Sequence, residues 1–172
     1  MARQRQLSWW ERRLENVVRS RPGTWFAINI ANPIDRRLLR WSNGRIGTYV
    51  GQPVGLLETT GARSGQPRTT PLLYLQDGER VVLVASKGGA PRHPSWYHNA
   101  IANREVVFMG RDGERRRYRV HTAAGDERNA LWGRCNDLYA GYDDYALRTG
   151  GRVIPVVVLE PVVAGDAESP HA

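Results

Sequence analysis

Residues 53–87 read PVGLLETTGARSGQPRTTPLLYLQDGERVVLVASK, and this stretch decides the fold. Runs rich in apolar and β-branched residues over 54–59, 68–76 and 80–86 are separated by turns that contain Gly or Asp-Gly, which predicts three short strands. The Asp-Gly pair at 77–78 is a typical signal for a tight hairpin between the second and third strands. This part of the chain therefore favours an antiparallel sheet.

The chain after residue 87 continues the pattern of short elements joined by turns. The further elements that the sequence predicts are a short helix that starts near Pro94, strands over 105–110 and 114–122, helices over 126–139 and 144–148, and a last strand over 152–160. The two middle strands are expected to pair across Asp112-Gly113 as a second hairpin. About six short, mostly antiparallel strands with few helices predict a small barrel or a rolled sheet, and they disfavour a doubly wound fold.

Two helices are predicted ahead of the sheet. Over residues 7–18 apolar side chains recur at spacings of three and four with arginines between them, which is typical of a basic amphipathic helix. A second helix over 32–44 has Asn-Pro at its start and Gly at its end. Docking of the first helix on its own domain is the interpretation we favour, and a lid over an apolar site or contact with an anionic membrane is the alternative. The expected organisation is a helical segment over 1–52 packed on the barrel, a barrel domain over 53–161 and a polar tail over 162–172.

Length and composition place the chain among globular proteins. Its 172 residues fit one domain, and the longest uncharged apolar run, 153–159, is far shorter than the roughly 20 residues needed to span a bilayer. Because no apolar segment follows the basic N-terminus, no secretory signal is expected, and a cytoplasmic location with peripheral membrane contact as an option follows. The single cysteine, Cys135, excludes an internal disulfide and is expected to be a small buried side chain.

The chain is strongly basic, with 25 Lys and Arg against 17 Asp and Glu and a net charge of +8. That balance indicates an acidic partner, which is nucleic acid, an anionic membrane surface or a polyanionic small molecule. The only lysine, Lys87, stands in a glycine-rich loop, whereas most arginines are spread over predicted helices and strands. The surroundings of Lys87 are therefore the first place to look for a binding site.

Two loops carry residues suited to binding an anion. The first, TTGARSGQPR over 59–68, combines hydroxyls and two arginines with glycines that let the backbone approach a ligand. A hairpin turn with solvated charges is the alternative for this loop. The second, SKGGAPRHPSW over 86–96, places a glycine pair and two cations directly before a predicted helix N-terminus, which favours bound anions. Trp96 either offers a flat wall to a planar ring or belongs to the core, and together the loops predict an elongated anionic ligand with an aromatic head.

Three motifs stand in a specific order along the chain. They are LLETTGARSGQPRTTPL over 56–72, VASKGG over 84–89 and HPSWYHN over 93–99. This ordered set resembles the deazaflavin-dependent nitroreductase family, and the resemblance continues through YAGYDDY over 139–145 to RVIPVVV over 152–158. It implies an α+β fold that is mainly antiparallel β, a split β-barrel of the FMN-binding type, with N-terminal helices and short helices flanking the barrel.

The resemblance also implies a cofactor, coenzyme F-420, an 8-hydroxy-5-deazaflavin that carries a phosphodiester and an oligoglutamate tail. Arg63, Ser64 and Arg68 are then expected to hold the phosphate or the tail carboxylates by charge-assisted hydrogen bonds. Lys87 and the backbone of the following glycine pair are expected to hold the other side. The cofactor-binding positions implied in this way are Arg63, Ser64, Arg68, Thr69, Thr70, Pro71, Ala85, Ser86, Lys87, Gly88, Gly89, Ser95 and Trp96.

The activity that the resemblance implies is hydride transfer from the reduced deazaflavin to a flat, apolar electrophile such as a quinone, an activated enone or a nitroaromatic compound. The cofactor performs the hard step, while the protein places the reacting atoms and offers a hydrogen-bond donor to the charge that develops. By their match to family positions, Ser86 is expected to contact the deazaflavin headgroup, and Tyr142 or Tyr145 to hydrogen-bond the acceptor and supply its proton. Packing of a helical turn against the barrel is the alternative for both tyrosines.

Two other functions are open from the sequence. A barrel of the same type that binds FMN is the closer alternative, and a basic nucleic-acid-binding module is the alternative from another class. The second depends on a cluster of arginines on one predicted hairpin, namely Arg111, Arg115, Arg116, Arg117 and Arg119. Alternation places Arg115, Arg117 and Arg119 on one face, where solvation is the interpretation we favour, so no nucleic-acid partner is expected. No metal is expected either, because His93 and His98 are five residues apart and no metal-binding motif occurs.

Overall fold

The computed structural model describes residues 52–162 of the chain. Its elements in chain order are β1 (Val54–Thr60), β2 (Pro67–Leu73), β3 (Leu75–Asp77), β4 (Arg80–Val84), the 3-10 turn η2 (Lys87–Gly89), α4 (Ser95–Asn103), β5 (Glu105–Met109), β6 (Arg115–Thr122), α5 (Gly125–Leu138), α6 (Gly141–Arg148) and β7 (Val156–Pro161). The two helices predicted before residue 45 and the polar tail predicted after residue 161 lie outside the described residues, apart from residue 162. The docking expected for the helix over 7–18, and its alternatives of a lid or of membrane contact, lie outside them as well.

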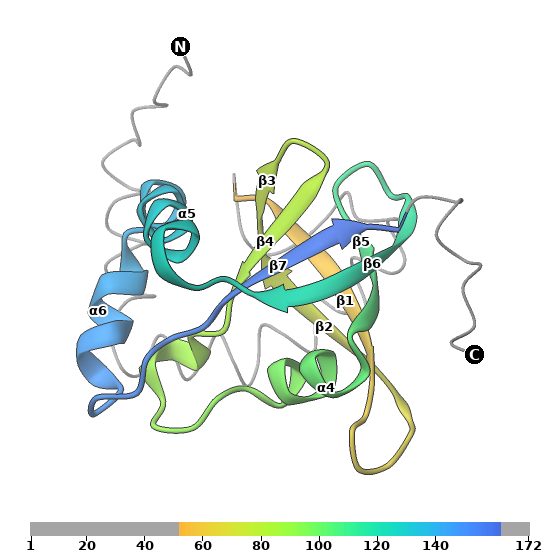
Figure 1. Cartoon of the computed structure of the whole chain (residues 1–172), viewed down its shortest axis with the longest axis horizontal. Coiled ribbons are helices and arrows are strands. Elements are labelled where there is room, and N and C mark those ends of the chain that lie inside the picture. Colours follow the sequence, from red (N-terminus) through yellow and green to blue (C-terminus); the bar gives the residue numbers. More distant parts are fainter. Residues whose placement is uncertain (1–51, 163–172) are drawn as a thin grey trace.

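The seven strands of residues 52–162 form one antiparallel sheet in the order β2-β1-β5-β6-β7-β4-β3. β2 and β3 lie at the two edges of this order, yet only Tyr74 separates them in the chain. The sheet must therefore curl until its edges meet, and β2 contacts β4, the neighbour of β3. Within the described sheet no ladder of hydrogen bonds joins β2 to β3, so the barrel is split along this line (Figure 1). The predicted split β-barrel is confirmed.

The curl gives the sheet two buried faces, because one face lines the barrel and the other lies under helices. Val81 and Leu83 of β4 belong to the barrel core, whereas Val82 and Val84 pack on the opposite face with α5 and α6. Residues 156–159 of β7 alternate between the same two cores. A strand that is buried on both faces needs no polar positions, which explains the uninterrupted run VVVL in β7.

Helices cover the barrel in two places. Figure 1 shows α5 and α6 together on one side of the sheet and α4 apart from them, beneath the ends of β1 and β2. α5 carries Asp126 and Glu127 in its first turn, where carboxylates interact favourably with the helix dipole. Gly141 opens α6, and glycine is required there because a Cβ atom would lie 2.4 Å from the ring of Tyr139. Cys135 is buried on α5 as predicted, and burial raises the pKa of its thiol to about 11.

The structure differs from the prediction at three boundaries. The second predicted strand is divided at Tyr74, whose buried ring turns into the barrel core, and this division produces seven strands instead of about six. The last strand starts at Val156 rather than at Arg152, because Arg152 turns aside to hold the loop before α4. The helix predicted over 144–148 begins earlier, at Gly141, and Asp143 and Asp144 lie in its first turn.

Candidate functional site

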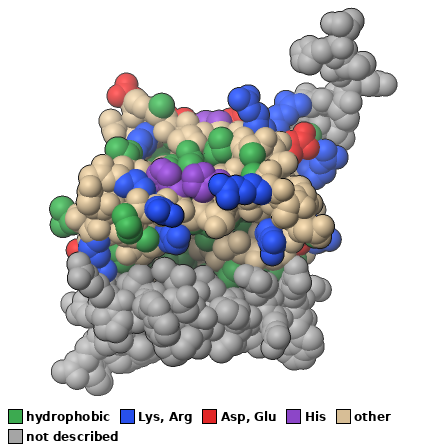
Figure 2. Space-filling view, turned by 90° about the horizontal axis from the view of Figure 1, so that it is seen from below, with side chains coloured by type: hydrophobic (Ala, Val, Ile, Leu, Met, Phe, Trp, Pro, Cys, Tyr) green, Lys and Arg blue, Asp and Glu red, His purple; other side chains and the backbone are tan. Residues whose placement is uncertain are grey.

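A cavity of about 1080 Å³ lies between two loops and the first turns of α4. Its described lining is Gly61, Ala62, Arg63, Ser64, Pro67, Arg68, Thr69, Thr70, Lys87, Arg92, His93, Ser95, Trp96, His98 and Asn99. Four of these side chains are permanently positive, Arg63, Arg68, Lys87 and Arg92, and none of the described lining residues is acidic. Figure 2, which views the molecule from the α4 side, shows histidine side chains beside Lys and Arg side chains. The charge suits an anion, and the volume, at the upper end for small-molecule sites, suits an extended one.

The first wall of the cavity is the turn between β1 and β2. The amide of Gly61 donates to the carbonyl of Gln66 at 2.9 Å, and the amide of Gly65 donates to the carbonyl of Gly61 at 2.8 Å. Gly65 has a φ of +64°, a left-handed conformation that favours glycine. This compact turn leaves the side chains of Arg63 and Ser64 exposed at the edge of the cavity, where both can reach a ligand.

α4 holds this turn in place through two asparagines. The side-chain oxygen of Asn99 accepts a hydrogen bond from the amide of Ala62 at 3.0 Å, and Nδ2 of Asn103 donates to the carbonyl of Thr60 at 2.9 Å. Trp96, in the first turn of the same helix, belongs to the barrel core and also lines the cavity. Trp96 is therefore a core residue, as one of its two predicted alternatives has it, and contact of its ring with a planar ligand stays a prediction.

The second wall is the loop over 85–93, between β4 and α4. Lys87, Gly88 and Gly89 have φ values of +48°, +62° and +80°, so the backbone makes a tight turn through the left-handed region. Gly89 packs closely on α6, because a Cβ atom there would lie 2.7 Å from the carbonyl oxygen of Tyr145. Lys87 is exposed on the cavity and is not glycine, so its backbone conformation is strained and must be held by its surroundings.

Arg152 holds this second loop from outside the cavity. Its guanidinium donates to three backbone carbonyls of the loop and to Nδ1 of His93, the latter at 3.0 Å. Because arginine only donates, Nδ1 of His93 must be the acceptor, and a neutral His93 ring carries its proton on Nε2. Burial lowers the pKa of His93, and the positive charge of Arg152 and the neighbouring His98 lower it further, so His93 is neutral at pH 7. Burial also lowers the pKa of Arg152.

Most of the predicted cofactor-binding residues meet in this cavity. Those that line it are Arg63, Ser64, Arg68, Thr69, Thr70, Lys87, Ser95 and Trp96. The other predicted positions are absent from its described lining and form the body of β2, the end of β4 and the loop behind it; they are Pro71, Ala85, Ser86, Gly88 and Gly89. Contact between the cofactor and these five positions stays a prediction.

Several lining residues are absent from the positions predicted from sequence. They are Gly61, Ala62, Pro67, Arg92, His93, His98 and Asn99. Arg92 lies in the loop singled out for its two cations, so its charge is the signal that identifies it. His98 and Asn99 lie in the motif over 93–99, but residue type gave them no binding role, and the helical turn that follows Trp96 brings them to the cavity.

Tyr142 and Tyr145 lie on α6, and both are buried. The hydroxyl of Tyr145 is 2.9 Å from that of Tyr139, and the rings of Tyr139 and Tyr142 are 5.2 Å apart, so the three tyrosines form one aromatic cluster. Neither Tyr142 nor Tyr145 is in the described lining of the cavity, although the backbone of Tyr145 contacts the second loop at Gly89. Their expected contact with an acceptor stays a prediction.

The basic hairpin of β5 and β6 is paired with acidic side chains. Arg115 forms an ion pair with Glu58 at 2.5 Å, and Arg117 forms one with Glu105 at 2.8 Å. These arginines are exposed, as predicted, and their acidic partners reduce the positive potential of the sheet face that a phosphate backbone would need. The pairing favours the solvated-face interpretation of this hairpin over nucleic-acid binding.

Metal binding and membrane crossing are two further properties on which residues 52–162 bear. Between residues 52 and 162 no group of three or more His, Cys, Asp or Glu side chains is placed to hold a metal ion. None of the helices described is both long enough and apolar enough to cross a membrane. The cytoplasmic location and the membrane contact stay predictions.

The fold and the cationic cavity define a split-barrel protein that binds an anionic organic cofactor. A family model described as F420H(2)-dependent quinone reductase matches residues 34–161, and the chain belongs to that family. F420H(2) is the reduced form of coenzyme F-420, so the deazaflavin cofactor and the oxidoreductase class expected from the sequence motifs are confirmed. The family is named for quinones, one of the three acceptor classes that the motifs imply.

Known proteins similar to this chain agree with that assignment. The F420H(2)-dependent quinone reductase Rv1261c of Mycobacterium tuberculosis (strain ATCC 25618 / H37Rv) is 43% identical over 130 residues, which cover 71% of this chain and 84% of the relative. A solved F420-H2 dependent reductase, FDR-A, is 37% identical with a TM-score of 0.56 and covers 62% of this chain and 93% of its own. A second solved structure, described as a domain-swapped dimer, is 33% identical with a TM-score of 0.59 and covers 81% of this chain and 99% of its own.

The residues of the cavity fit coenzyme F-420. Its phosphodiester and glutamate carboxylates need cationic donors, and permanent cations stand on both walls with no acidic residue in the described lining. Its planar ring system needs a flat apolar surface, and Trp96 is the apolar aromatic residue of the described lining. The length of the coenzyme needs an extended cavity, and the volume of about 1080 Å³ supplies it.

Proposed function

We propose that this chain catalyses hydride transfer from reduced coenzyme F-420 to a quinone, and that the coenzyme binds in the cavity between the two loops. The observation that carries the proposal is the set of four permanent cations, Arg63, Arg68, Lys87 and Arg92, around a cavity whose described lining holds no acidic residue. The name of the family supplies the chemical class of both substrates.

The two walls divide the binding of the anionic groups. The guanidinium groups of Arg63 and Arg68 match planar, bidentate binding of phosphate or carboxylate oxygens. Lys87, on the opposite wall, offers a compact ammonium group, and the hydroxyls of Ser64 and Ser95 add neutral donors. Anions held from both sides keep the coenzyme in one orientation, which a single basic patch would not do.

The reduced coenzyme supplies the hydride, and the chain supplies binding and orientation. Trp96 limits the movement of a planar ring, because its own side chain is locked in the barrel core. Ser86, at the end of β4, contacts the deazaflavin headgroup in this proposal. Both loops are held by hydrogen bonds from other parts of the chain, which restrict the movement of the two walls around the coenzyme.

On the acceptor side, Tyr142 or Tyr145 donates a hydrogen bond to the quinone oxygen in this proposal. The variants Tyr142→Phe and Tyr145→Phe each remove one hydroxyl, and at least one of them is expected to lower kcat by about 100-fold without changing the Kd of the coenzyme. Tyr139→Phe is the matched control, because it breaks the hydroxyl pair with Tyr145 and leaves both predicted donors in place. Wild-type turnover in both variants would show that neither tyrosine has this role.

The decisive experiment is a fluorescence titration of the full chain with coenzyme F-420, beside FMN and single-stranded DNA, at physiological salt. Saturable quenching by the deazaflavin alone is expected, followed by oxidation of the reduced coenzyme when the quinone menadione is added. Binding of FMN without binding of coenzyme F-420 would contradict the proposed cofactor and indicate that the chain uses FMN. Salt-sensitive binding of DNA by a chain that does not bind the deazaflavin would contradict the proposed function and support nucleic-acid binding instead.

A further inference from the structure

Arg152 has no part in the function as proposed so far, yet it makes more hydrogen bonds to the second loop than any other side chain described. Its bonds run from Nε to the carbonyl of Ala90 (3.0 Å), from Nη1 to the carbonyl of Ala85 (3.4 Å) and Nδ1 of His93 (3.0 Å), and from Nη2 to the carbonyls of Ser86 and Ala90 (2.8 Å each). Arg152 follows α6 in the chain, about 60 residues after the loop that it contacts. One side chain therefore ties the two ends of the loop together.

These five hydrogen bonds use all five N–H donors of the guanidinium. No donor is left for a ligand, and Arg152 is absent from the described lining of the cavity. This separates Arg152 from Arg63, Arg68 and Arg92, which line the cavity and have donors to offer. Any effect of Arg152 on the coenzyme must pass through the loop.

The loop needs such support because its backbone is strained. Lys87 has a φ of +48°, and a non-glycine residue pays a conformational cost there unless its surroundings hold it. Arg152 binds the carbonyls of Ser86 and Ala90, on either side of this turn. The same bonds keep carbonyl oxygens, which would repel an anion, directed at the guanidinium.

The ring of His93 is fixed by the same group. Nδ1 accepts from Arg152, and the rings of Tyr97 and His98 lie with their centroids 5.1 and 5.8 Å from that of His93. His93 lines the cavity, so its orientation shapes the wall beside Arg92. Arg152 and His93 thus form one polar pair, in which His93 lines the cavity and Arg152 lies behind it, outside the described lining.

We propose that Arg152 is the positioning residue of the coenzyme site, holding the loop over 85–93 in the shape that presents Lys87, Arg92 and His93 to the cavity. The inference rests on the proposed function, since the loop matters as a wall of the coenzyme site. A lysine in place of Arg152 keeps the positive charge, but its three donors diverge from one nitrogen and cannot span both ends of the loop. Geometry and charge can therefore be separated by experiment.

The test compares Arg152→Lys and Arg152→Gln with the wild-type chain by fluorescence titration with coenzyme F-420, below the Tm of each variant. Both variants are expected to raise the Kd by about tenfold or more, because several charge-assisted hydrogen bonds to the loop are lost. Arg128→Gln is the matched control, since Arg128 is also half-buried and donates to the carbonyl of Ile154 outside the cavity. Its Kd is expected to equal that of the wild type.

Position 93 gives a second comparison. In His93→Asn the amide oxygen can stand near the place of Nδ1 and still accept from Arg152, whereas in His93→Gln it extends toward the place of Nε2. Both variants are expected to raise the Kd, since His93 lines the cavity, and the Asn variant is expected to raise it by a smaller factor, because only Asn keeps the acceptor for Arg152. The reverse order would overturn the positioning role, because His93 would then act by touching the coenzyme.

A spectroscopic readout on the free protein completes the test. Long-range nitrogen–proton NMR of the imidazole rings is expected to show His93 protonated only on Nε2 in the wild type and as a mixture of tautomers in Arg152→Gln. Wild-type binding by either Arg152 variant, or an unchanged His93 tautomer in Arg152→Gln, would overturn the inference alone. A wild-type chain that does not bind coenzyme F-420 would overturn the proposed function, and the inference with it.

Discussion

Lys87 shows how much of this site depends on single residues. It is the only lysine in the chain, it lies in the glycine-rich loop over 85–93, and its backbone adopts a left-handed conformation that few non-glycine residues occupy. A glycine would remove the strain at this position but also the charge. Lysine at this position therefore costs backbone strain, and it places an ammonium group at a fixed point on the cavity wall.

Replacement of this lysine by an uncharged chain of similar length tests that view. Lys87→Met is expected to raise the Kd of coenzyme F-420 by about tenfold, because one charge-assisted hydrogen bond is lost while the loop keeps its backbone. The measurement is the fluorescence titration, with Arg117→Met as a control that removes an exposed cation of the β6 hairpin. An equal loss of affinity in both variants would mean that net charge, and not position, decides binding.

Among the elements, α4 joins the barrel core to the cavity. Its buried face carries Trp96 and Ala100, and its side chains Asn99 and Asn103 reach the turn between β1 and β2. The helix is therefore positioned by hydrophobic packing and in turn positions the first wall. This arrangement makes the shape of that wall depend on a helix that follows it by about 35 residues in the chain.

One hydrogen bond from α4 to the turn can be removed by a substitution outside the described cavity lining. Asn103→Ala removes the one hydrogen bond from Asn103 to the turn, at the carbonyl of Thr60, and also a bond to the carbonyl of Asn99 within α4; Asn103 is absent from the described lining. The Kd of coenzyme F-420 is expected to rise about threefold, as for the loss of one neutral hydrogen bond. Asn129→Ala, at an exposed position of α5, serves as the control and should bind as the wild type does.

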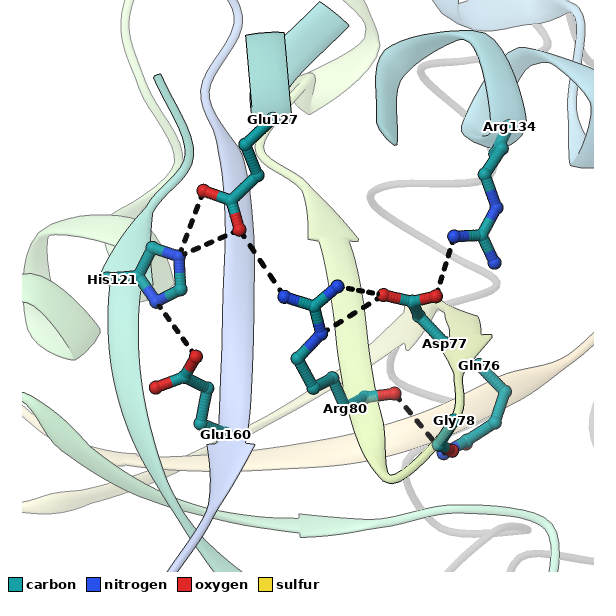
Figure 3. Close-up of polar contacts among 8 residues, drawn as sticks. All are labelled: Gln76, Asp77, Gly78, Arg80, His121, Glu127, Arg134 and Glu160. Carbon is teal, nitrogen blue, oxygen red and sulfur yellow. Dashed lines mark hydrogen bonds and ion pairs between the residues drawn. The ribbon is translucent and has the colours of Figure 1, made fainter. Parts of the chain in front are cut away.

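A second set of contacts between elements anchors α5 to the sheet. Figure 3 shows the carboxylate of Asp77, at the end of β3, between Arg80 of β4 and Arg134 of α5. Arg80 also reaches Glu127 of α5 at 3.5 Å, and Glu127 lies 3.2 Å from His121 of β6. The hydrogen bonds from Arg134 and Arg80 hold the pKa of Asp77 below its usual value.

This shift predicts a pH dependence of stability. Because the folded carboxyl group has the lower pKa, its contribution is complete above the unfolded pKa of about 3.9 and is lost as the pH falls through the lower folded value. Asp77→Asn is expected to lower the free energy of unfolding by about 1 kcal/mol at pH 7, a small effect because the side chains of Arg80 and Arg134 are 39% and 46% exposed.

Denaturant unfolding at several pH values checks this prediction. The wild-type and Asp77→Asn curves are expected to keep a constant separation from pH 7 to about pH 5 and to converge as the pH falls through the lowered folded-state pKa of Asp77. Glu79→Gln is the control, because it removes an exposed carboxylate from the same hairpin turn. A separation that persists at low pH would mean that Asp77 stabilises the hairpin by something other than its charge.

At the scale of the whole molecule, positive charge is divided between two uses. The net charge of +8 draws anions to the chain, yet arginines on the β6 hairpin are paired with Glu58 and Glu105. The cavity is different, since four permanent cations face it and its described lining offers them no carboxylate. The positive potential available to a ligand is thus concentrated at the cavity.

That concentration predicts a salt dependence of binding. Between 50 and 500 mM NaCl the Kd of coenzyme F-420 is expected to rise by roughly tenfold, because salt screens cations that are partly open to solvent. A deazaflavin that lacks the phosphate and the glutamate tail should show a smaller dependence, since fewer charges are involved. Equal salt dependence of the two ligands would mean that the cations do not bind the tail.

The sequence by itself determined the parts of this protein that depend on neighbouring residues. Turn chemistry at Asp77-Gly78 and Asp112-Gly113 predicts both hairpins, because a turn is decided by a few adjacent residues. Residue type alone makes 59–68 and 86–96 candidate walls of an anion site, since glycine and the basic side chains have few equivalents for that chemistry. The ordered motifs over 56–72, 84–89 and 93–99 also indicated the family.

Only the tertiary structure decided which distant residues meet. Tyr74 divides one apolar run into two strands at opposite edges of the sheet, because the sheet curls and its edges return to each other. Arg152 belongs to a run predicted as strand and instead holds the loop over 85–93. The residues next to it in the sequence do not indicate that partner. Such contacts depend on the closure of the whole barrel, and local periodicity, which acts over a few residues, carries no information about it.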